Sequence, residues 1–256
     1  MAVVVPRETL RRCFVLHRRD YSNTSLLLDL FAADGERMTV LARGAKRGRA
    51  SLCPILQPFQ PLWASWSGRG EVKNLNAAEA AGPPLELPGP ALYCGLYLNE
   101  LLTRLLVQGD THPDLFVFYH GALQGLAASA DLQTVLRQFE LRLLEEMGYA
   151  PHLAQADDGP VQAEYRYLCA PDQPPRRVLA GEGGSQSIAG ATLLALAAGT
   201  PLREAVMARQ ARDLLRRLLA PHLGPKPLKS RELFRLAQVN TASRSAMAGH
   251  GVGSGG

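Results

Sequence analysis

The segment SLLLDLFAADGERMTVLAR, residues 25–43, decides how the first third of the chain folds. Two apolar runs, 25–31 and 37–43, flank the dipeptide Asp34-Gly35. Asp-Gly between apolar runs is a strong hairpin signal, because both residues accept the positive φ angles of a tight turn. We therefore predict two antiparallel strands joined at this dipeptide.

Three further short apolar runs surround this hairpin and bring the number of predicted strands to five. They cover residues 11–17, 59–66 and 71–75, and Gly68-Arg69-Gly70 forms a turn between the last two. Five short strands in roughly 80 residues fit a small closed barrel, of which the oligonucleotide/oligosaccharide-binding (OB) fold is the common nucleic-acid-binding form. Residues 1–80 are therefore predicted to be an OB-fold nucleic-acid-binding domain.

The charge distribution supports a polyanion partner for this domain. The 256-residue chain has 28 Lys and Arg against 23 Asp and Glu, and residues 1–80 alone hold 12 basic and 7 acidic side chains. Like charge concentrated in one segment is typical of a surface for polyanions. Only four of the basic residues are lysines. The planar fork of arginine suits phosphate contacts, although a codon bias would produce the same composition.

The basic residues gather in the loop Arg43-Gly-Ala-Lys-Arg-Gly-Arg49, where two glycines leave the backbone free to follow a phosphate chain. Such contacts weaken as salt rises and are largely indifferent to base sequence. Tyr21, in a polar loop, is the candidate for stacking on bases. The alternative is an ordinary solvated hairpin loop. The predicted DNA-binding residues are Arg18, Arg19, Tyr21, Arg43, Lys46, Arg47, Arg49, Arg69 and Lys73.

A change of period after the Pro/Gly-rich joint at residues 81–90 indicates a helical domain over residues 91–238. Its predicted helices lie around 98–105, 113–128, 132–143 and 200–219. Thr111 and Asp114 are spaced as a capping-box pair before the second helix, and Thr200-Pro201 resembles the start of the last one. Residues 148–186 are predicted to be an irregular insertion with strands only at 165–168 and 177–179, and residues 239–256 a flexible Gly-rich tail. The expected fold class is a multidomain α+β protein.

A second basic cluster lies between residues 203 and 235, where basic side chains exceed acidic ones by six. Arginines next to apolar side chains on a helix suit an acidic peptide with a hydrophobic tip. A charged solvent-facing helix surface is the alternative. The predicted peptide-binding residues are Arg137, Arg209, Arg212, Arg216 and Lys226.

Signals for catalysis, metal binding and membrane insertion are missing from the sequence. It contains no HExxH, GxxxxGK[ST] or GxSxG motif, and its six histidines are scattered. The four cysteines are isolated and form no CxxC pair, so we expect neither a disulfide nor a metal. Neither a membrane span nor a signal peptide is present, which predicts a cytoplasmic protein. The missing catalytic motifs predict a protein that is not an enzyme and uses no cofactor.

Six segments stand out along the chain: FVLHRRDYSNTSLLL (14–28), ARGAKR (42–47), LQPF (56–59), GEVK (70–73), GLYLNELL (95–102) and GPKPLKSRELF (224–234). Together they resemble the RecO family of bacterial DNA repair proteins. The order of the segments and their spread over nearly the whole chain make this resemblance specific.

The resemblance implies a non-enzymatic recombination mediator of the RecF pathway, associated with the nucleoid. Such a protein binds single- and double-stranded DNA, anneals complementary strands and indirectly helps to load RecA. RecR and the acidic C-terminal tail of single-stranded-DNA-binding protein are the implied partners. Many family members carry a four-cysteine zinc site in the insertion, where this chain has only Cys169, so it is similar to the branch without zinc. Two other functions stay open from the residues alone, an RNA-binding OB-fold protein and a scaffold for an acidic peptide.

Overall fold

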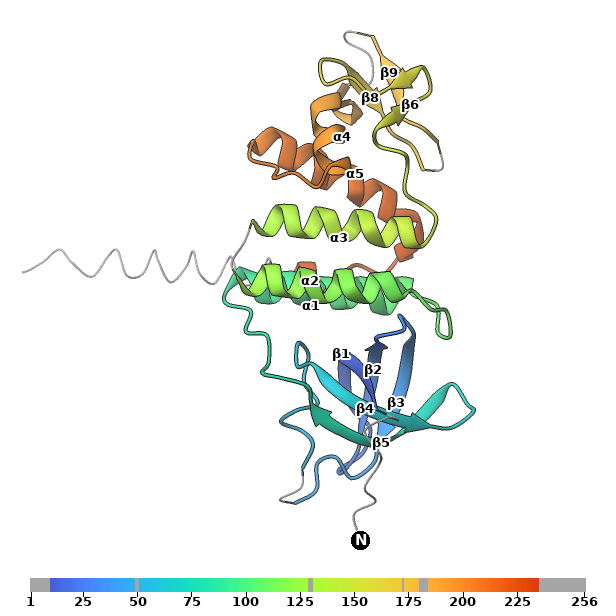
Figure 1. Cartoon of the computed structure of the whole chain (residues 1–256), viewed down its shortest axis with the longest axis vertical. Helices are drawn as coiled ribbons and strands as arrows, with labels where there is room; N and C mark the ends of the chain where they lie inside the picture. Colours follow the sequence, from blue (N-terminus) through green and yellow to red (C-terminus); the bar gives the residue numbers. More distant parts are fainter. Residues whose placement is uncertain (1–9, 49–50, 129–130, 172, 180–183, 235–256) are drawn as a thin grey trace, which may run out of the picture.

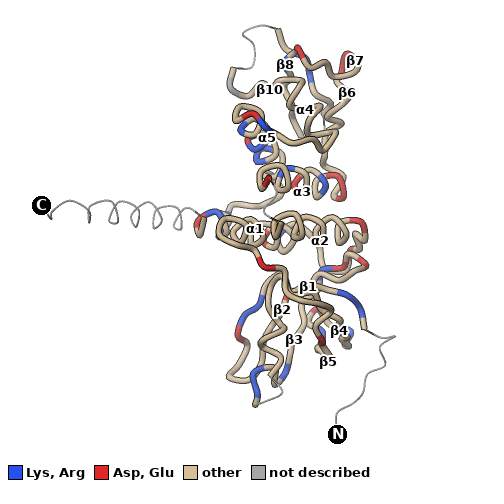
Figure 2. Tube along the Cα trace, turned by 60° about the vertical axis from the view of Figure 1, so that its left-hand side comes forward, with Lys and Arg blue, Asp and Glu red and all other residues tan. Residues whose placement is uncertain are grey.

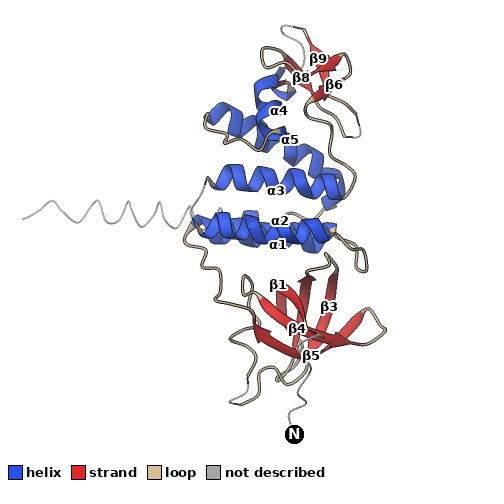
Figure 3. Ribbon diagram, viewed as in Figure 1, coloured by secondary structure: helices blue, strands red, loops and turns tan. Residues whose placement is uncertain are grey.

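The computed structural model describes residues 10–48, 51–128, 131–171, 173–179 and 184–234 of the chain. A β-barrel forms one end of an elongated molecule, layers of helices form the middle, and a small β-rich unit forms the other end (Figures 1 and 3). The predicted tail, residues 239–256, lies outside the described residues. Among the described residues, no helix is long and apolar enough to cross a membrane.

The N-terminal unit is a closed barrel with the strand order β1-β2-β3-β5-β4, in which only the β3–β5 pair is parallel. The hairpin predicted at Asp34-Gly35 joins β2 and β3, which confirms that prediction. Alternate residues of these two strands point inward and are buried, as expected for strands with one face in a core. All five predicted strands are present: β1 (Arg11–Asp20), β2 (Leu26–Ala32), β3 (Arg37–Ala42), β4 (Leu62–Ser67) and β5 (Val72–Ala80).

Five helices of 8 to 19 residues form most of the described C-terminal part, and they pack through apolar faces into one core. The predicted helical class is confirmed, with a helix at 190–197 that the sequence analysis did not predict. The helices are α1 (Pro90–Leu105), α2 (Pro113–Ala127), α3 (Leu132–Glu146), α4 (Gly190–Ala197) and α5 (Ala205–Leu223).

One predicted helix cap and one predicted helix start are wrong, although α2 begins at Pro113 as predicted. The N-cap of α2 is His112 and no side chain caps that end, so the Thr111–Asp114 capping box does not form. The last helix begins at Ala205 rather than at Thr200-Pro201, because Thr200 serves the preceding helix instead. The backbone N–H of Thr200 donates to the carbonyl of Ala195, closing the end of α4.

The predicted irregular insertion contains more regular structure than expected. A three-stranded sheet, β10-β8-β9, packs against the helical core through Tyr167 and Ile188, both buried. A two-stranded sheet, β6-β7, joins the same core through the buried Ala156. The two predicted strands correspond to β8 and β9. The bounds are β6 (Gln155–Ala156), β7 (Gly159–Pro160), β8 (Arg166–Leu168), β9 (Arg176–Val178) and β10 (Ile188–Ala189), with a 3₁₀ turn η2 (Gly184–Gln186).

The barrel and the helices share a core. Phe14 of β1 and Phe31 of β2 belong to the helical core, and the ring of Phe14 meets that of Tyr119 of α2 edge-on, with centroids 5.4 Å apart. The Tyr119 hydroxyl donates a 2.6 Å hydrogen bond to Oδ1 of Asn99, whose Nδ2 donates to the carbonyl of Leu16 over 2.9 Å. These groups are buried, so the bonds fix the orientation of the barrel on α1 and α2.

The joint between the two parts is also packed. The amide of Leu85 donates to the carbonyl of Phe59 at 3.0 Å, and Leu85 and Leu87 lie against the shared core.

The β2–β3 hairpin also contacts the helices closely. Its Gly35 has a φ of 78°, and a Cβ there would lie 2.0 Å from the backbone of His112. Only glycine allows this approach of the barrel to the start of α2.

Candidate nucleic-acid interface and a second cationic pocket

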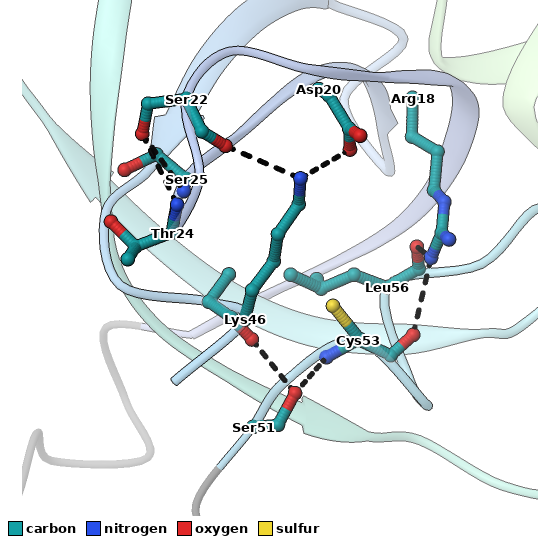
Figure 4. Close-up of polar contacts among 10 residues, drawn as sticks. Arg18, Asp20, Ser22, Thr24, Ser25, Lys46, Ser51, Cys53 and Leu56 are labelled. Atoms are coloured by element: carbon teal, nitrogen blue, oxygen red, sulfur yellow. Dashed lines mark hydrogen bonds and ion pairs between the residues drawn. The ribbon is translucent and has the colours of Figure 1, made fainter. Parts of the chain in front are cut away.

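The two loops predicted to carry DNA-binding residues meet at the end of the barrel that faces away from the helices, where Figure 2 shows basic residues gathered. The amide of Lys46 donates to the carbonyl of Thr24 over 3.1 Å, which joins the β3–β4 loop to the β1–β2 loop. The Lys46 ammonium reaches the carbonyl of Ser22 at 3.2 Å and Oδ1 of Asp20 at 2.6 Å (Figure 4). Lys46 therefore holds the loops together as well as contributing charge.

The shape of the basic loop follows from one buried residue and two glycines. Ala45 is buried, and its carbonyl accepts hydrogen bonds from the Ser51 hydroxyl and the Leu52 amide at 3.0 and 2.9 Å. Gly44 and Gly48 have φ values of 68° and 60°, so the chain turns sharply on both sides of this anchor. Arg43 and Arg47 are consequently exposed.

Arg18 has a different environment from the one predicted. Its Nη1 donates to the carbonyls of Cys53 and Leu56, each at 3.3 Å, so the side chain fastens the 51–56 segment to β1 (Figure 4). The guanidinium is thus engaged within the protein. Its charge still adds to the field of this barrel end.

Arg19 and Tyr21 complete the surface next to the two loops. Arg19 is exposed near the end of β1, and Tyr21, which follows β1, is 65% exposed. The described residues that present free side chains here are therefore Arg19, Tyr21, Arg43 and Arg47. We call these four residues the barrel-tip surface. Arg49 lies outside the described residues.

Arg69 and Lys73 lie apart from the barrel-tip surface. Arg69 is in the β4–β5 turn. In the same turn, the backbone carbonyl of Glu71 accepts a 2.7 Å hydrogen bond from the side-chain amide of Gln108, which lies in the α1–α2 connection. This turn therefore lies at the helical end of the barrel. Lys73 pairs with Val40, in the middle of β3.

A second cationic site is a pocket of about 540 Å³ between α1, α3 and α5. Its walls combine arginines with aromatic and aliphatic side chains. The structure brings three of the five predicted peptide-binding residues into this pocket, namely Arg137, Arg212 and Arg216. Arg209 and Lys226 are exposed but do not line it.

Arg137 lies at the buried side of this pocket. Its Nη1 is 2.8 Å from Oε2 of Glu140, and the Tyr97 hydroxyl donates to the other carboxylate oxygen over 2.6 Å. Burial raises the pKa of Glu140, and the positive charge of Arg137 opposes that shift. Nε of Arg137 is buried and has no hydrogen-bond partner among the described residues, so it is an unsatisfied donor.

Several pocket residues were missed by the sequence analysis. Tyr97 and Glu140 belong to no charge cluster along the chain, whereas Arg231 lies in the second basic cluster but was not among the predicted peptide-binding residues. Long-range packing brings the three together. The i, i+3 spacing of Arg137 and Glu140 on an otherwise apolar helix face was the available signal. Within the described ranges, no three His, Cys, Asp or Glu side chains are placed to hold a metal ion.

Comparison with known proteins gives matches over nearly the full length of the chain. Residues 7–84 match the family "Recombination protein O N terminal" and residues 89–232 match "Recombination protein O C terminal". The chain is 48% identical over 231 residues to the DNA repair protein RecO of Methylococcus capsulatus, covering 90% of this chain and 94% of that relative. It is also 46% identical over 228 residues to the DNA repair protein RecO of Yersinia pestis, covering 88% and 93%. With the protein of the same name from Nitrosospira multiformis it shares 40% identity over 242 residues, covering 92% and 98%.

Proposed function

The chain belongs to the RecO family of DNA repair proteins, and we propose that it acts as a non-enzymatic mediator that binds single- and double-stranded DNA and anneals complementary strands. The observation that carries this proposal is the barrel-tip surface, where the end of β1 and two joined loops carry three exposed arginines and an exposed tyrosine. Arginines neutralise phosphates and an aromatic ring stacks on bases, which are the two contacts that a single strand requires.

A salt titration of single-strand binding tests the barrel-tip surface. Each phosphate contact contributes about 0.7 to the slope of log K against log salt for a single strand, so Arg43→Ala with Arg47→Ala is expected to flatten the slope by roughly 1.4. Arg203→Ala with Arg209→Ala removes the same charge far from the barrel and is the control. Equal slopes for the wild-type protein and the loop variant would contradict this assignment.

A competition between DNA and RNA of the same sequence tests the nucleic-acid class. Arginine contacts to phosphate do not distinguish the two backbones. For a repair protein we expect DNA to compete at least as well as RNA. Clear preference for RNA would instead support the RNA-binding alternative.

We further propose that the pocket between α1, α3 and α5 binds the acidic C-terminal tail of single-stranded-DNA-binding protein. Arg137, Arg212 and Arg216 would face the acidic residues, and the aromatic wall would receive an apolar terminal side chain. Binding of a fluorescent acidic peptide ending in Phe, and its loss in Arg212→Ala with Arg216→Ala, is the expected result.

These two sites together suit a mediator on the nucleoid. The pocket would bring the protein to coated DNA and the barrel would contact the strand. We also propose that the protein binds RecR and indirectly helps to load RecA. Co-purification with RecR tests the proposed binding.

A further inference from the structure

The outer wall of the pocket is made by the last described segment of the chain, residues 226–234. After α5 ends, the chain passes Gly224 and a short helical stretch runs from Lys229 to Phe234. The segment contributes six of the fifteen residues that line the pocket: Pro227, Leu228, Ser230, Arg231, Glu232 and Phe234. We call residues 226–234 the pocket wall.

Two side chains of α1 hold the pocket wall from behind. Glu100 accepts hydrogen bonds from the amide of Lys229 at 3.0 Å and from the amide and hydroxyl of Ser230 at 2.9 and 2.7 Å. The guanidinium of Arg104 donates to the carbonyls of Lys226 and Pro227, both at 2.6 Å. Glu100 and Arg104 also form an ion pair of 2.7 Å, one helical turn apart.

These contacts satisfy backbone groups that the pocket wall cannot pair by itself. The first amides of a helical stretch have no partner within it, and a carboxylate placed there supplies one and complements the helix dipole. Arg104 does the same for the carbonyls that precede the stretch. The two side chains therefore provide five hydrogen bonds to one short segment, and neither side chain lines the pocket.

The pocket-facing side of the wall depends on this fixed position. The guanidinium of Arg231 lies over the ring of Tyr97 at 5.4 Å, and the ring of Phe234 meets that of Tyr93 edge-on at 5.8 Å. Arg231 adds a further positive charge to the pocket, and Phe234 adds aromatic surface. Movement of the wall away from α1 would remove both from the site.

We propose that Glu100 and Arg104 are positioning residues for the acidic-peptide pocket, which they complete by holding the pocket wall over α1 and α3. This inference rests on the proposed function of the pocket. It predicts that peptide affinity depends on a carboxylate that does not touch the peptide.

The test uses full-length Glu100→Gln protein and an acidic peptide ending in Phe, followed by fluorescence anisotropy. We expect the affinity to fall by roughly tenfold, the loss that follows when charge-assisted bonds to the wall are removed. Amide hydrogen exchange at Lys229 and Ser230 should become faster in the same variant, while single-strand DNA binding stays unchanged. Glu145→Gln, an equally conservative change on α3 outside the pocket, is the control.

Each other outcome has a distinct meaning. If Glu100→Gln binds the peptide as tightly as the wild type, or loses DNA binding to the same degree, the inference is overturned. If the wild-type protein itself does not bind the peptide, the proposed pocket function fails, and the inference falls with it. Should Glu100→Gln fold poorly, Arg104→Gln removes the other two hydrogen bonds to the pocket wall and must lower peptide affinity in its place.

Discussion

The ammonium of Lys46 lies 2.6 Å from the carboxylate of Asp20, and this ion pair joins the β3–β4 loop to the end of β1 (Figure 4). The Asp20 side chain is largely exposed. An exposed ion pair contributes only about 0–1 kcal/mol, so a DNA phosphate can replace Asp20 at the ammonium without a large cost. If the barrel tip binds DNA as proposed, Asp20 competes with its phosphates for Lys46.

Asp20→Asn is therefore expected to tighten single-strand DNA binding. Removal of a negative charge from a phosphate-binding surface should raise affinity several-fold at low salt and make the salt dependence steeper. Asp110→Asn, in the exposed α1–α2 connection, is the matched control and should have no effect. The measurement is fluorescence anisotropy at two salt concentrations. Weaker binding by Asp20→Asn would show that the ion pair organises the loops and does not compete with DNA.

Replacement of the exposed aromatic ring tests base stacking at the barrel tip. Tyr21→Ala should lose about 1–3 kcal/mol of single-strand binding free energy, whereas Tyr21→Phe, which keeps the ring, should bind nearly as the wild type does. Because the ring is 65% exposed, folding stability should change little in either variant. The prediction is wrong if the Ala and Phe variants bind equally well.

A substitution at Gly35 tests the rigid contact between barrel and helices. Gly35→Ala would force the backbone of His112 to move, and the residue would still need its φ of 78°. Overpacking and a positive φ together should cost roughly 2–4 kcal/mol of unfolding free energy. Thermal unfolding measures the loss, and Gly121→Ala on the exposed face of α2, where a Cβ meets nothing within 4 Å, is the control. A stability equal to that of the control would contradict the described contact.

The contribution of Glu100 to stability should disappear in acid. Burial alone would raise the pKa of Glu100, but its bonds from Ser230 and Lys229 and the charge of Arg104 outweigh burial and hold the pKa below its ordinary value of 4.5. A carboxyl with a lowered pKa in the folded state stabilises the protein at higher pH. That stabilisation is lost as the pH falls through the folded-state pKa.

The measurement is the difference in unfolding free energy between wild type and Glu100→Gln. It should be about 1–2 kcal/mol from neutral pH down to about 5 and should shrink below pH 4. A difference that stays constant in acid would rule out this role for the Glu100 carboxylate.

Local signals predicted the barrel well and the pocket poorly. Asp34-Gly35 encodes its own turn, so the hairpin followed from neighbouring residues alone. Thr200-Pro201 has the composition of a helix start, yet Thr200 bonds to Ala195 and the helix begins five residues later, because a contact with the preceding helix decided the outcome. Tyr97, Glu140 and Arg231 are far apart in sequence, and only the packing of three elements makes them one site.

The binding residues show the same division. Exposure of Arg43 and Arg47 followed from a Gly-flanked loop, whereas the internal bonds of Arg18 and Lys46 depend on segments that the chain brings back from a distance. Charge clusters along a sequence identify candidates. They do not show which cations the fold has already paired.

Annealing of complementary single strands, bare or coated with single-stranded-DNA-binding protein, tests the central claim most directly. The wild-type protein should accelerate annealing of both kinds of strand. Arg43→Ala with Arg47→Ala should slow both reactions, and Arg212→Ala with Arg216→Ala should slow only the reaction of coated strands. A wild-type protein that accelerates neither, or variants that anneal coated strands as fast as the wild type, would contradict the account.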